Sequence, residues 1–255
     1  MEFAAGARQH IHVVAAAIED GQGRVLVARR APGAHQGGLW EFPGGKLEPG
    51  EGPVEGLDRE LREELGIGVL AARPLIRVHH DYGDRRVLLD VHRVTAYSGT
   101  PEGREGQPLS WLAPDAMDPD VFPAADRPII TALRLPSLYL ITGPDPAEPE
   151  TFLRRLSTAL DRGVRLVQLR AHTLAPAAYG RLAQAAFALC QGCGARLILN
   201  ADPDLARDLP SQGLHLTQER LWRVDRRPVA AGAAGVWCGA SCHDARDLQR
   251  AAAIG

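Results

Sequence analysis

The stretch that decides the fold of the first half of this chain runs from Gly45 to Ile67 and reads GKLEPGEGPVEGLDRELREELGI. We expect a helix over Val54 to Leu65, because Pro53 stands at its start and Gly66 follows its last residue. At 100° per residue, four aliphatic side chains fall in one arc and predict a buried stripe. These are Val54, Leu57, Leu61 and Leu65.

The same helix carries an acidic arc beside the aliphatic one. Glu60, Glu63 and Glu64 are spaced three and four residues apart, where like charges repel by a few tenths of a kcal/mol per pair. Clustered carboxylates suit a hard divalent cation such as Mg²⁺, particularly when substrate phosphates complete its ligand shell. The alternative is a solvated face on which Arg59 and Arg62 pair with the acids.

The residues around the acidic arc favour the metal site. The pattern G-x5-E-x7-R-E-U-x-E-E-x-G-U, in which U is aliphatic, is matched at nine positions. These are Gly45, Glu51, Arg59, Glu60, Leu61, Glu63, Glu64, Gly66 and Ile67. The stretch resembles the Nudix box. Three further segments resemble the MutT branch of that family in the same order: ARRAPGAHQGGLWEFPGGKLEPGE at 28–51, REGQP at 104–108 and FPAADRPII at 122–130.

The resemblance covers about residues 10–135 and implies a Nudix α/β/α sandwich with a mixed sheet in a domain spanning 1–135. It implies metal ligands at the Gly45 carbonyl oxygen and at three helix carboxylates, Glu60, Glu63 and Glu64. Glu105 would be a further ligand or the base. Glu60 is the other candidate for the base, and Arg59 belongs to the catalytic set.

The resemblance also implies the substrate and the chemistry. We expect Arg30 and His35 along the phosphates and sugar of a nucleotide, Phe42 near its base, and Mg²⁺, or alternatively Mn²⁺, as the cofactor. The implied reaction is hydrolysis of an oxidised nucleoside triphosphate such as 8-oxo-dGTP to a monophosphate and pyrophosphate, a step in DNA repair. Divalent ions suit this reaction because they cancel the charge that repels an attacking water.

Asp126 departs from the pattern of the bacterial MutT proteins, which usually have asparagine there. An ionised aspartate only accepts hydrogen bonds, whereas an amide also donates them. Asp126 also precedes Arg127, at the start of an expected short helix, where aspartate is a good N-cap. Contact with the base, capping of the helix, or both remain open.

The other elements of the first half follow from local pattern. His12–Ile18 and Val25–Arg29 predict a β-hairpin around the polar residues 19–23. Residues 30–50 are too rich in Gly and Pro for one regular element. Val87–Tyr97 predicts a strand, and Asp126–Leu133 predicts a helix.

From Ser137 onward, apolar strands alternate with helical stretches, which predicts βα units on a parallel sheet. The strands are LYLIT (138–142), VRLVQLR (164–170), RLILN (196–200), GLHLT (213–217) and VWCGAS (236–241), and the main helices Pro149–Arg162, Pro176–Cys190 and His243–Ala253. Together with GLHLTQ at 213–218 and GASCH at 239–243, this half resembles thiamine-phosphate synthase and its TenI-like relatives, which are (β/α)8 barrels. We expect a domain over 137–255, after a boundary near 133–137, with about five of eight units of a TIM-barrel-like fold.

Four residues at strand ends match positions that would contact a pyrophosphate and a pyrimidine. These are Gln168, Arg170, Asn200 and Ser241. Three substitutions disfavour thiamine-phosphate synthesis: His172 replaces a lysine, and Ala201 and Arg220 replace aspartates that bind Mg²⁺. We therefore expect a non-catalytic module that binds or senses a ligand. A pyrophosphate of thiamine metabolism is the alternative substrate of the first domain.

Composition and charge exclude several classes of function for this chain. The chain has 255 residues with 29 basic and 31 acidic side chains, so it lacks the basic excess of a protein that coats nucleic acid or anionic membranes. No apolar run of about 18 residues or secretory signal is present, which predicts a protein of the cytoplasm. Four cysteines at 190, 193, 238 and 242 predict buried thiols rather than a zinc site. An incomplete barrel leaves unpaired strand edges, which favours a homodimer.

Overall fold

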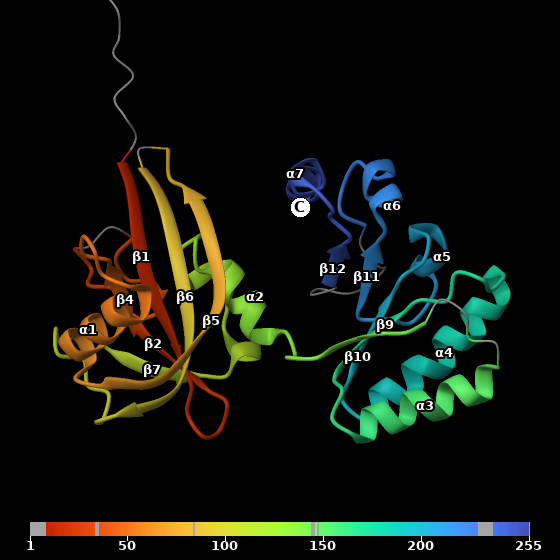
Figure 1. Ribbon diagram of the computed structural model, residues 1–255, viewed down its shortest axis with the longest axis horizontal. Coiled ribbons are helices and arrows are strands. Elements are labelled where there is room, and N and C mark those ends of the chain that lie inside the picture. The colour runs from red at the N-terminus through yellow and green to blue at the C-terminus, as the bar shows by residue number, and fades with distance from the viewer. Residues whose placement is uncertain are drawn as a thin grey trace, which may run out of the picture. The chain divides into compact units, whose positions relative to one another are not determined.

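The computed structural model describes residues 9–33, 36–83, 85–143, 146, 148–228 and 237–254. The chain divides into two compact units, Met1–Leu135 and Pro136–Gly255, and each is considered by itself (Figure 1). Among the described residues there is no helix with the length and hydrophobicity needed to cross a bilayer.

The first unit contains a mixed four-stranded sheet and a smaller antiparallel sheet. In the larger sheet β1 runs parallel to β6, and the other pairs are antiparallel. Its order is β4 (Gly44–Lys46), β1 (Gln9–Ile18), β6 (Arg85–Ser98), β5 (Gly68–Asp81). The smaller sheet has the order β3 (Trp40–Glu41), β2 (Val25–Arg29), β7 (Leu109–Leu112). Two single-turn 3-10 helices, Pro114–Ala116 and Pro119–Val121, precede the last helix of the unit.

Two helices cover opposite faces of the larger sheet, α1 (Pro53–Leu65) and α2 (Arg127–Arg134) (Figure 1). Alternation along β1 explains this arrangement, because successive side chains point to opposite faces. Val14 and Ala16 pack in the core that contains α1, whereas Ala15 and Ala17 pack in the core that contains α2. The unit is the α/β/α sandwich with a mixed sheet that the sequence predicts.

The predicted helix over the Nudix-like stretch is confirmed. Gly66 ends α1 in the left-handed conformation with φ +72°, which costs a glycine nothing. Leu57, Leu61 and Leu65 are fully buried, as expected, but Val54 is 46% exposed. The buried stripe therefore begins at Leu57, and its predicted start in the first turn of the helix is wrong.

The predicted hairpin is also wrong, because its two strands belong to different sheets. The turn exists: Asp20 accepts hydrogen bonds from the backbone N–H groups of Gln22 and Arg24. A single bridge joins Glu19 to Val25, after which β1 and β2 diverge. They do so because β4 and β6 occupy the two edges of β1.

The sequence pattern does not reveal β5, which pairs with β6 along most of its length. Pro74 interrupts the strand-like pattern there, and the register shifts between Pro74 and Ile76. A bulge accommodates the missing donor of a proline within a ladder.

The described residues of the second unit form a five-stranded, all-parallel sheet with helices, of the incomplete TIM-barrel type, which confirms the expected βα repetition. Its strands, in the order β12-β11-β10-β9-β8, are Trp237–Ala240, Gly213–Leu216, Arg196–Leu199, Leu166–Leu169 and Tyr139–Ile141. Its helices are α3 (Pro149–Asp161), α4 (Pro176–Gly192), α5 (Pro203–Arg207), α6 (Gln218–Arg223) and α7 (Ala245–Ile254). The two shortest helices, α5 and α6, were not predicted, because each is too short to show a helical repeat of apolar residues.

The four cysteines lie in the second unit and form no disulfide. Cys190 is buried and the other three are partly buried. Burial raises the pKa of the Cys190 thiol to about 11, so this side chain is protonated at neutral pH.

Candidate functional site

Helix α1 presents two carboxylates to strand β4. A Cβ atom added to Gly45 would overlap the carboxyl group of Glu60, so the two are in close contact. Oε2 of Glu64 accepts a hydrogen bond of 3.3 Å from the backbone N–H of Gly44. Gly44 has φ +147°, and a side chain there would overlap the backbone of β1. Gly45 thus lets the backbone of β4 approach the acidic helix, and Gly44 lets it approach β1.

Arg59 holds the carboxylates around it in fixed positions. Its Nε and Nη2 donate to the two oxygens of Glu51 at 2.9 and 3.0 Å, a bidentate pair. Its Nη1 donates to Glu60 at 3.0 Å and to Glu63 at 3.4 Å, and Nη2 also reaches the carbonyl oxygen of Lys46 at 3.0 Å. Arg59 therefore joins α1 to the segment that follows β4.

The loop over residues 99–108 fixes Glu105 beside this helix. The last carbonyls of α1 have no partner within the helix, and the loop supplies donors to them. The backbone N–H of Arg104 and Nε2 of Gln107 both donate to the carbonyl oxygen of Glu64, at 3.0 and 3.2 Å. The backbone N–H of Glu105 in turn donates to Oε1 of Gln107 at 2.9 Å. Capping of α1 thus positions an acidic side chain from a distant part of the sequence.

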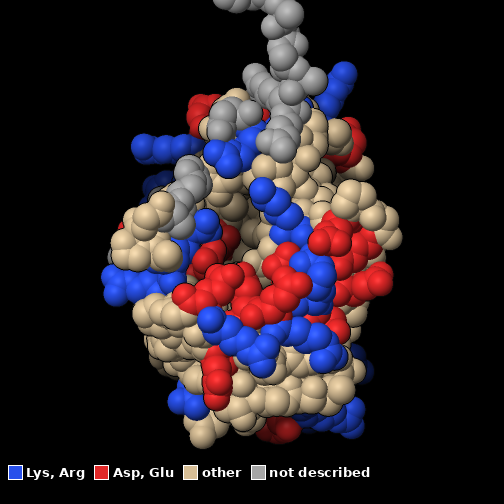
Figure 2. All heavy atoms as spheres, turned by 90° about the vertical axis from the view of Figure 1, so that its left-hand side faces the viewer, with Lys and Arg blue, Asp and Glu red and all other residues tan. Residues whose placement is uncertain are grey.

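Two adjoining cavities open at this place, with volumes of about 330 and 440 Å³. Arg30, Glu41 and Glu64 line both. The smaller cavity also contains Phe42 and Asp126, and Gly45 of β4 lies on its wall. Glu105 and Gln107 line the larger cavity. Figure 2 shows acidic side chains gathered around a hollow on the side of the first unit that carries α1, with basic side chains between them.

The electrostatics of Glu64 indicate a place for positive charge. The pKa of Glu64 is raised to about 7, mainly by burial and also by the nearby carboxylates of Glu60, Glu105 and Glu41, against the hydrogen bond from Gly44. A carboxyl group in a negative field becomes fully ionised when a cation binds beside it.

The groups at this site that could bind a metal are the Gly45 carbonyl and the surrounding carboxylates. All of them offer oxygen atoms, which fits a divalent cation of the Mg²⁺ type. Within the described ranges, no three acidic, histidine or cysteine side chains converge as a ready-made metal cage. Glu60 and Glu63 are instead bonded to Arg59. An ion held by a few carboxylates together with substrate phosphates matches this arrangement better than an ion enclosed by protein alone.

Asp126 is a buried carboxyl group on the wall of the smaller cavity. It occupies the N-cap position of α2 and is 7% exposed, but its side chain makes no capping hydrogen bond. It accepts instead from the backbone N–H of Phe42. Burial raises the pKa of Asp126 to about 7, and Glu41 contributes in the same direction, whereas Arg30 opposes the shift. The interpretation as a simple cap is therefore wrong.

The remaining predicted residues of the first unit differ in their placement. Phe42 is buried, its ring stacks on that of Phe122 with a centroid distance of 5.7 Å, and it lines the smaller cavity as expected for a residue near the base. Glu63 is 62% exposed and lines neither cavity. His35 lies outside the described residues.

Glu41 is a residue of the site that the sequence reasoning missed. It forms an ion pair with Arg30, and burial raises its own pKa. It affects both Glu64 and Asp126, because its charge acts on each of them. The only signal in the sequence was its place directly before Phe42.

In the second unit, three of the four predicted ligand residues lie on neighbouring strand ends. Nδ2 of Asn200 donates to Oε1 of Gln168 at 2.9 Å, and Nη1 of Arg220 donates to Oδ1 of Asn200 at 2.9 Å. Arg170 donates from Nε to Nε2 of His172 at 3.1 Å. Ser241 is paired with another partner, His215, at 2.9 Å.

The Mg²⁺ implied for a thiamine-phosphate synthase does not fit this second group of residues. Ala201 is buried and offers no ligand, and the Arg220 guanidinium occupies the lone-pair side of Asn200. Asp202, one position further along, caps α5 by accepting from the backbone N–H of Asp204 at 3.0 Å. A divalent ion would meet a cation there instead of a carboxylate.

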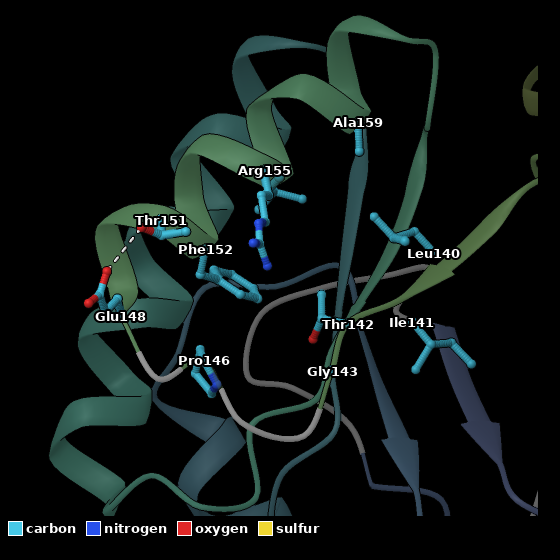
Figure 3. Close-up of a pocket in the computed structure, with 11 residues that line it drawn as sticks. Leu140, Ile141, Thr142, Gly143, Pro146, Glu148, Thr151, Phe152, Arg155 and Ala159 are labelled. Atoms are coloured by element: carbon cyan, nitrogen blue, oxygen red, sulfur yellow. Dashed lines mark hydrogen bonds between the residues drawn. The ribbon is translucent and has the colours of Figure 1, made fainter.

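A cavity of about 530 Å³ lies between β8 and α3 (Figure 3). Its described lining is largely apolar and includes Leu140, Phe152 and Leu156. Its one described carboxylate, Glu148, accepts from the hydroxyl of Thr151 at 3.2 Å. This lining offers no paired acid and base, so the candidate active site is the acidic hollow of the first unit.

Comparison with known proteins agrees with this division of the chain. Residues 14–132 match the model of the NUDIX domain family, and residues 138–255 match that of the thiamine monophosphate synthase family. The 8-oxo-dGTP diphosphatase of Escherichia coli is 34% identical over 124 residues, covering 49% of this chain and 96% of that protein. The CTP pyrophosphohydrolase of Escherichia coli is 38% identical, covering 48% of this chain and 90% of that protein.

The second unit has a relative of its own kind. The thiamine-phosphate synthase of Marinobacter nauticus is 35% identical over 122 residues, covering 47% of this chain, and this chain spans about half, 53%, of that protein. The similarity to the 8-oxo-dGTP diphosphatase covers nearly the full length of that protein and includes the acidic helix and the loop that caps it. This chain therefore belongs to the Nudix family, and it carries a thiamine-phosphate-synthase-like domain after its Nudix domain.

Proposed function

We propose that the chain hydrolyses nucleoside triphosphates, including 8-oxo-dGTP, to a monophosphate and pyrophosphate with Mg²⁺. The observation that carries this proposal is the junction of two cavities at Glu64. One cavity has Phe42 and Asp126 for a base, and the other has Glu105 for the reacting phosphates. The names of relatives that align over the whole Nudix domain support the same reaction.

The residues that would hold the ion are the Gly45 carbonyl, Glu60, Glu63 and Glu64. A bound divalent cation supplies charge neutralisation to the polyphosphate oxygens. Manganese would fit the same oxygen ligands.

The chain's own residues supply orientation and proton transfer. Arg59 holds Glu60 in place, and that hydrogen bond occupies one oxygen of the Glu60 carboxylate. Glu105 makes no such bond to an arginine side chain in the described part of the chain and borders the larger cavity. We infer that Glu105 accepts the proton of the attacking water. Arg30, on the wall shared by both cavities, would orient the phosphates.

Asp126 would read the base in its neutral form. A protonated carboxyl group both donates and accepts a hydrogen bond, as the amide of asparagine does. This resolves the apparent conflict between an aspartate at this position and recognition of 8-oxoguanine, whose O6 requires a donor.

A pyrimidine triphosphate is the second candidate substrate, favoured by the similarity to a CTP pyrophosphohydrolase. A panel of 8-oxo-dGTP, dGTP, CTP and thiamine diphosphate with Mg²⁺ would separate these proposals by kcat/KM and by the identity of the products. We expect the highest value for 8-oxo-dGTP, with pyrophosphate as a product. A higher value for CTP or thiamine diphosphate would replace the proposed substrate, and no turnover of any of the four would refute the reaction.

For the second unit we propose a non-catalytic role and self-association. Within the described ranges β8 and β12 each pair with a neighbour on one side, and an unpaired strand edge can pair with a second copy. Size-exclusion chromatography with light scattering should show a dimer; a monomer at micromolar concentration would contradict the proposal.

A further inference from the structure

We propose that the cavity between β8 and α3 binds an organic carboxylate that carries an apolar chain, such as a medium-chain fatty acid. The proposal rests on the apolar lining of this cavity and on one arginine that points into it. It is independent of hydrolysis by the first unit.

The cavity lies on the helix side of the sheet, away from the predicted ligand residues at the strand ends. Successive side chains of a strand point to opposite faces. On one face of β8 the hydroxyl of Tyr139 accepts from Gln168, whereas Leu140 packs against the core cluster shared with α3 and α4. Leu140 and side chains of α3 line the cavity, so a ligand here would not occupy the place where Gln168 and Asn200 meet.

Apolar side chains form most of the described lining. Leu156 is buried, and Leu140 and Phe152 are partly buried against the same core. Ile141 is 50% exposed at the edge of the sheet, and Ala159 leaves room further along α3. The volume of about 530 Å³ lies within the range of small-molecule sites. An apolar chain placed here would remove both its own surface and that of the lining from water.

The hydroxyl groups of the lining are already engaged. Thr142 accepts from the backbone N–H of Arg170 at 2.9 Å and donates to the carbonyl oxygen of the same residue at 3.1 Å. Thr151 donates to Glu148 at 3.2 Å and accepts from Arg154 at 3.5 Å. A hydroxyl has one proton to donate, so neither threonine has a donor left for an anion.

Arg155 supplies the donors that the threonines lack. Its side chain points from α3 into the cavity (Figure 3). In the described part of the chain its guanidinium forms no hydrogen bond or ion pair, so its five N–H donors are open to a ligand. A guanidinium binds a carboxylate through two parallel hydrogen bonds. A carboxylate held by Arg155 would leave its chain against the apolar lining.

Glu148 limits the charge of the head group. Its carboxylate belongs to the lining and is turned toward the hydroxyl of Thr151 (Figure 3). A negative side chain repels a dianion more strongly than a monoanion. A carboxylate is therefore favoured over a phosphate monoester, which carries a charge of about −1.5 to −2 at neutral pH.

The experiment is a titration of the full chain at neutral pH with hexanoate, octanoate and octyl phosphate, followed by isothermal calorimetry. Arg155→Gln removes the cation, and Ala159→Phe fills the cavity but keeps the cation. Arg154→Gln is the matched control, because Arg154 is the preceding residue of α3 and does not line the cavity.

We expect octanoate to bind wild type about 10-fold more tightly than hexanoate, because two more methylene groups are buried. Octyl phosphate should bind more weakly than octanoate. Arg154→Gln should bind octanoate as wild type does, whereas Arg155→Gln should bind it at least about 10-fold more weakly, since a charge-assisted contact is lost. Ala159→Phe should also bind it more weakly.

Four results would each overturn the proposal: no saturable binding of octanoate by wild type, equal binding of hexanoate and octanoate, tighter binding of octyl phosphate, or unchanged binding of octanoate by Arg155→Gln. Circular dichroism and thermal unfolding check that the variants are folded. If Ala159→Phe does not fold, Arg155→Gln decides alone, because Arg155 is exposed and its substitution removes no buried contact. Hydrolysis of nucleotide should be the same in all four proteins, which separates this site from the first unit.

Discussion

The raised pKa of the buried Asp126 carboxyl group predicts how stability and substrate recognition depend on pH. Its pKa is raised from 3.8 to about 7, mainly by burial. One pKa unit corresponds to about 1.4 kcal/mol, so ionisation in the folded protein costs about 4 kcal/mol more than in water. Asp126→Asn has nearly the same shape, donates and accepts, and never ionises.

The sign of the effect on stability follows from this shift. Because the folded pKa lies above the unfolded one, wild type loses stability relative to Asp126→Asn as pH rises from about 4 to about 7. The two proteins should unfold at similar temperatures near pH 4. Above pH 7.5 the variant should be more stable by up to about 4 kcal/mol, which is about 10 °C or more in Tm for a unit of this size.

The same ionisation should weaken recognition of the base. We would measure kcat/KM for 8-oxo-dGTP between pH 5.5 and 8 with wild type and with Asp126→Asn and divide the first value by the second, so that the pH dependence of the chemical step cancels. Loss of one donated hydrogen bond to a base is worth about 1–2 kcal/mol, so this quotient should fall about 10-fold across this range. A quotient independent of pH, with equal Tm values for both proteins at pH 8, would refute the neutral-carboxyl account.

Three further changes test the acidic hollow. Glu64→Gln should fold normally and lose at least about 100-fold in kcat, because it removes a carboxylate at the junction of the cavities; circular dichroism provides the check on folding. Gly45→Ala should displace Glu60, because the added Cβ would overlap its carboxyl group, and should therefore weaken activation by Mg²⁺. Gly21→Ala is the control, because its added Cβ meets no atom within 4 Å, and it should behave as wild type. Arg59→Lys should lose the bidentate pair and about 1–3 kcal/mol of stability by chemical denaturation, with a lower kcat; unchanged values would show that Arg59 does not organise the site. EDTA should abolish turnover, and Mg²⁺ should restore it.

The helix was predictable from sequence because its signals are local. Pro53 and Gly66 mark its ends, and Leu57 and Leu61 give its buried face. Val54 continues the spacing of the leucines, but it is exposed. Its exposure depends on where the neighbouring elements end, and the spacing of apolar residues within the helix carries no information about that. In the same way the residues around Asp20 predicted the turn correctly, but the destination of each strand depends on its distant partners.

The site was predictable as a set of residues but not as a set of interactions. The spacing of Glu60, Glu63 and Glu64 indicated carboxylates together on one face of a helix, whereas the role of Gln107 in fixing Glu105 arises only when the loop caps that helix. The raised pKa of Asp126 likewise results mainly from its burial, which a substitution pattern in the sequence does not contain.

The affinity for manganese of wild type, compared with that of Glu64→Gln, tests the central claim most directly. Manganese can be titrated into the full chain and followed by electron paramagnetic resonance, in the presence of a non-hydrolysable nucleoside triphosphate analogue. The account predicts saturable binding by wild type and at least about 10-fold weaker binding by Glu64→Gln of unchanged fold. Equal affinity in the two proteins would mean that the acidic turn of α1 does not gather the ion, and the proposed mechanism would be wrong.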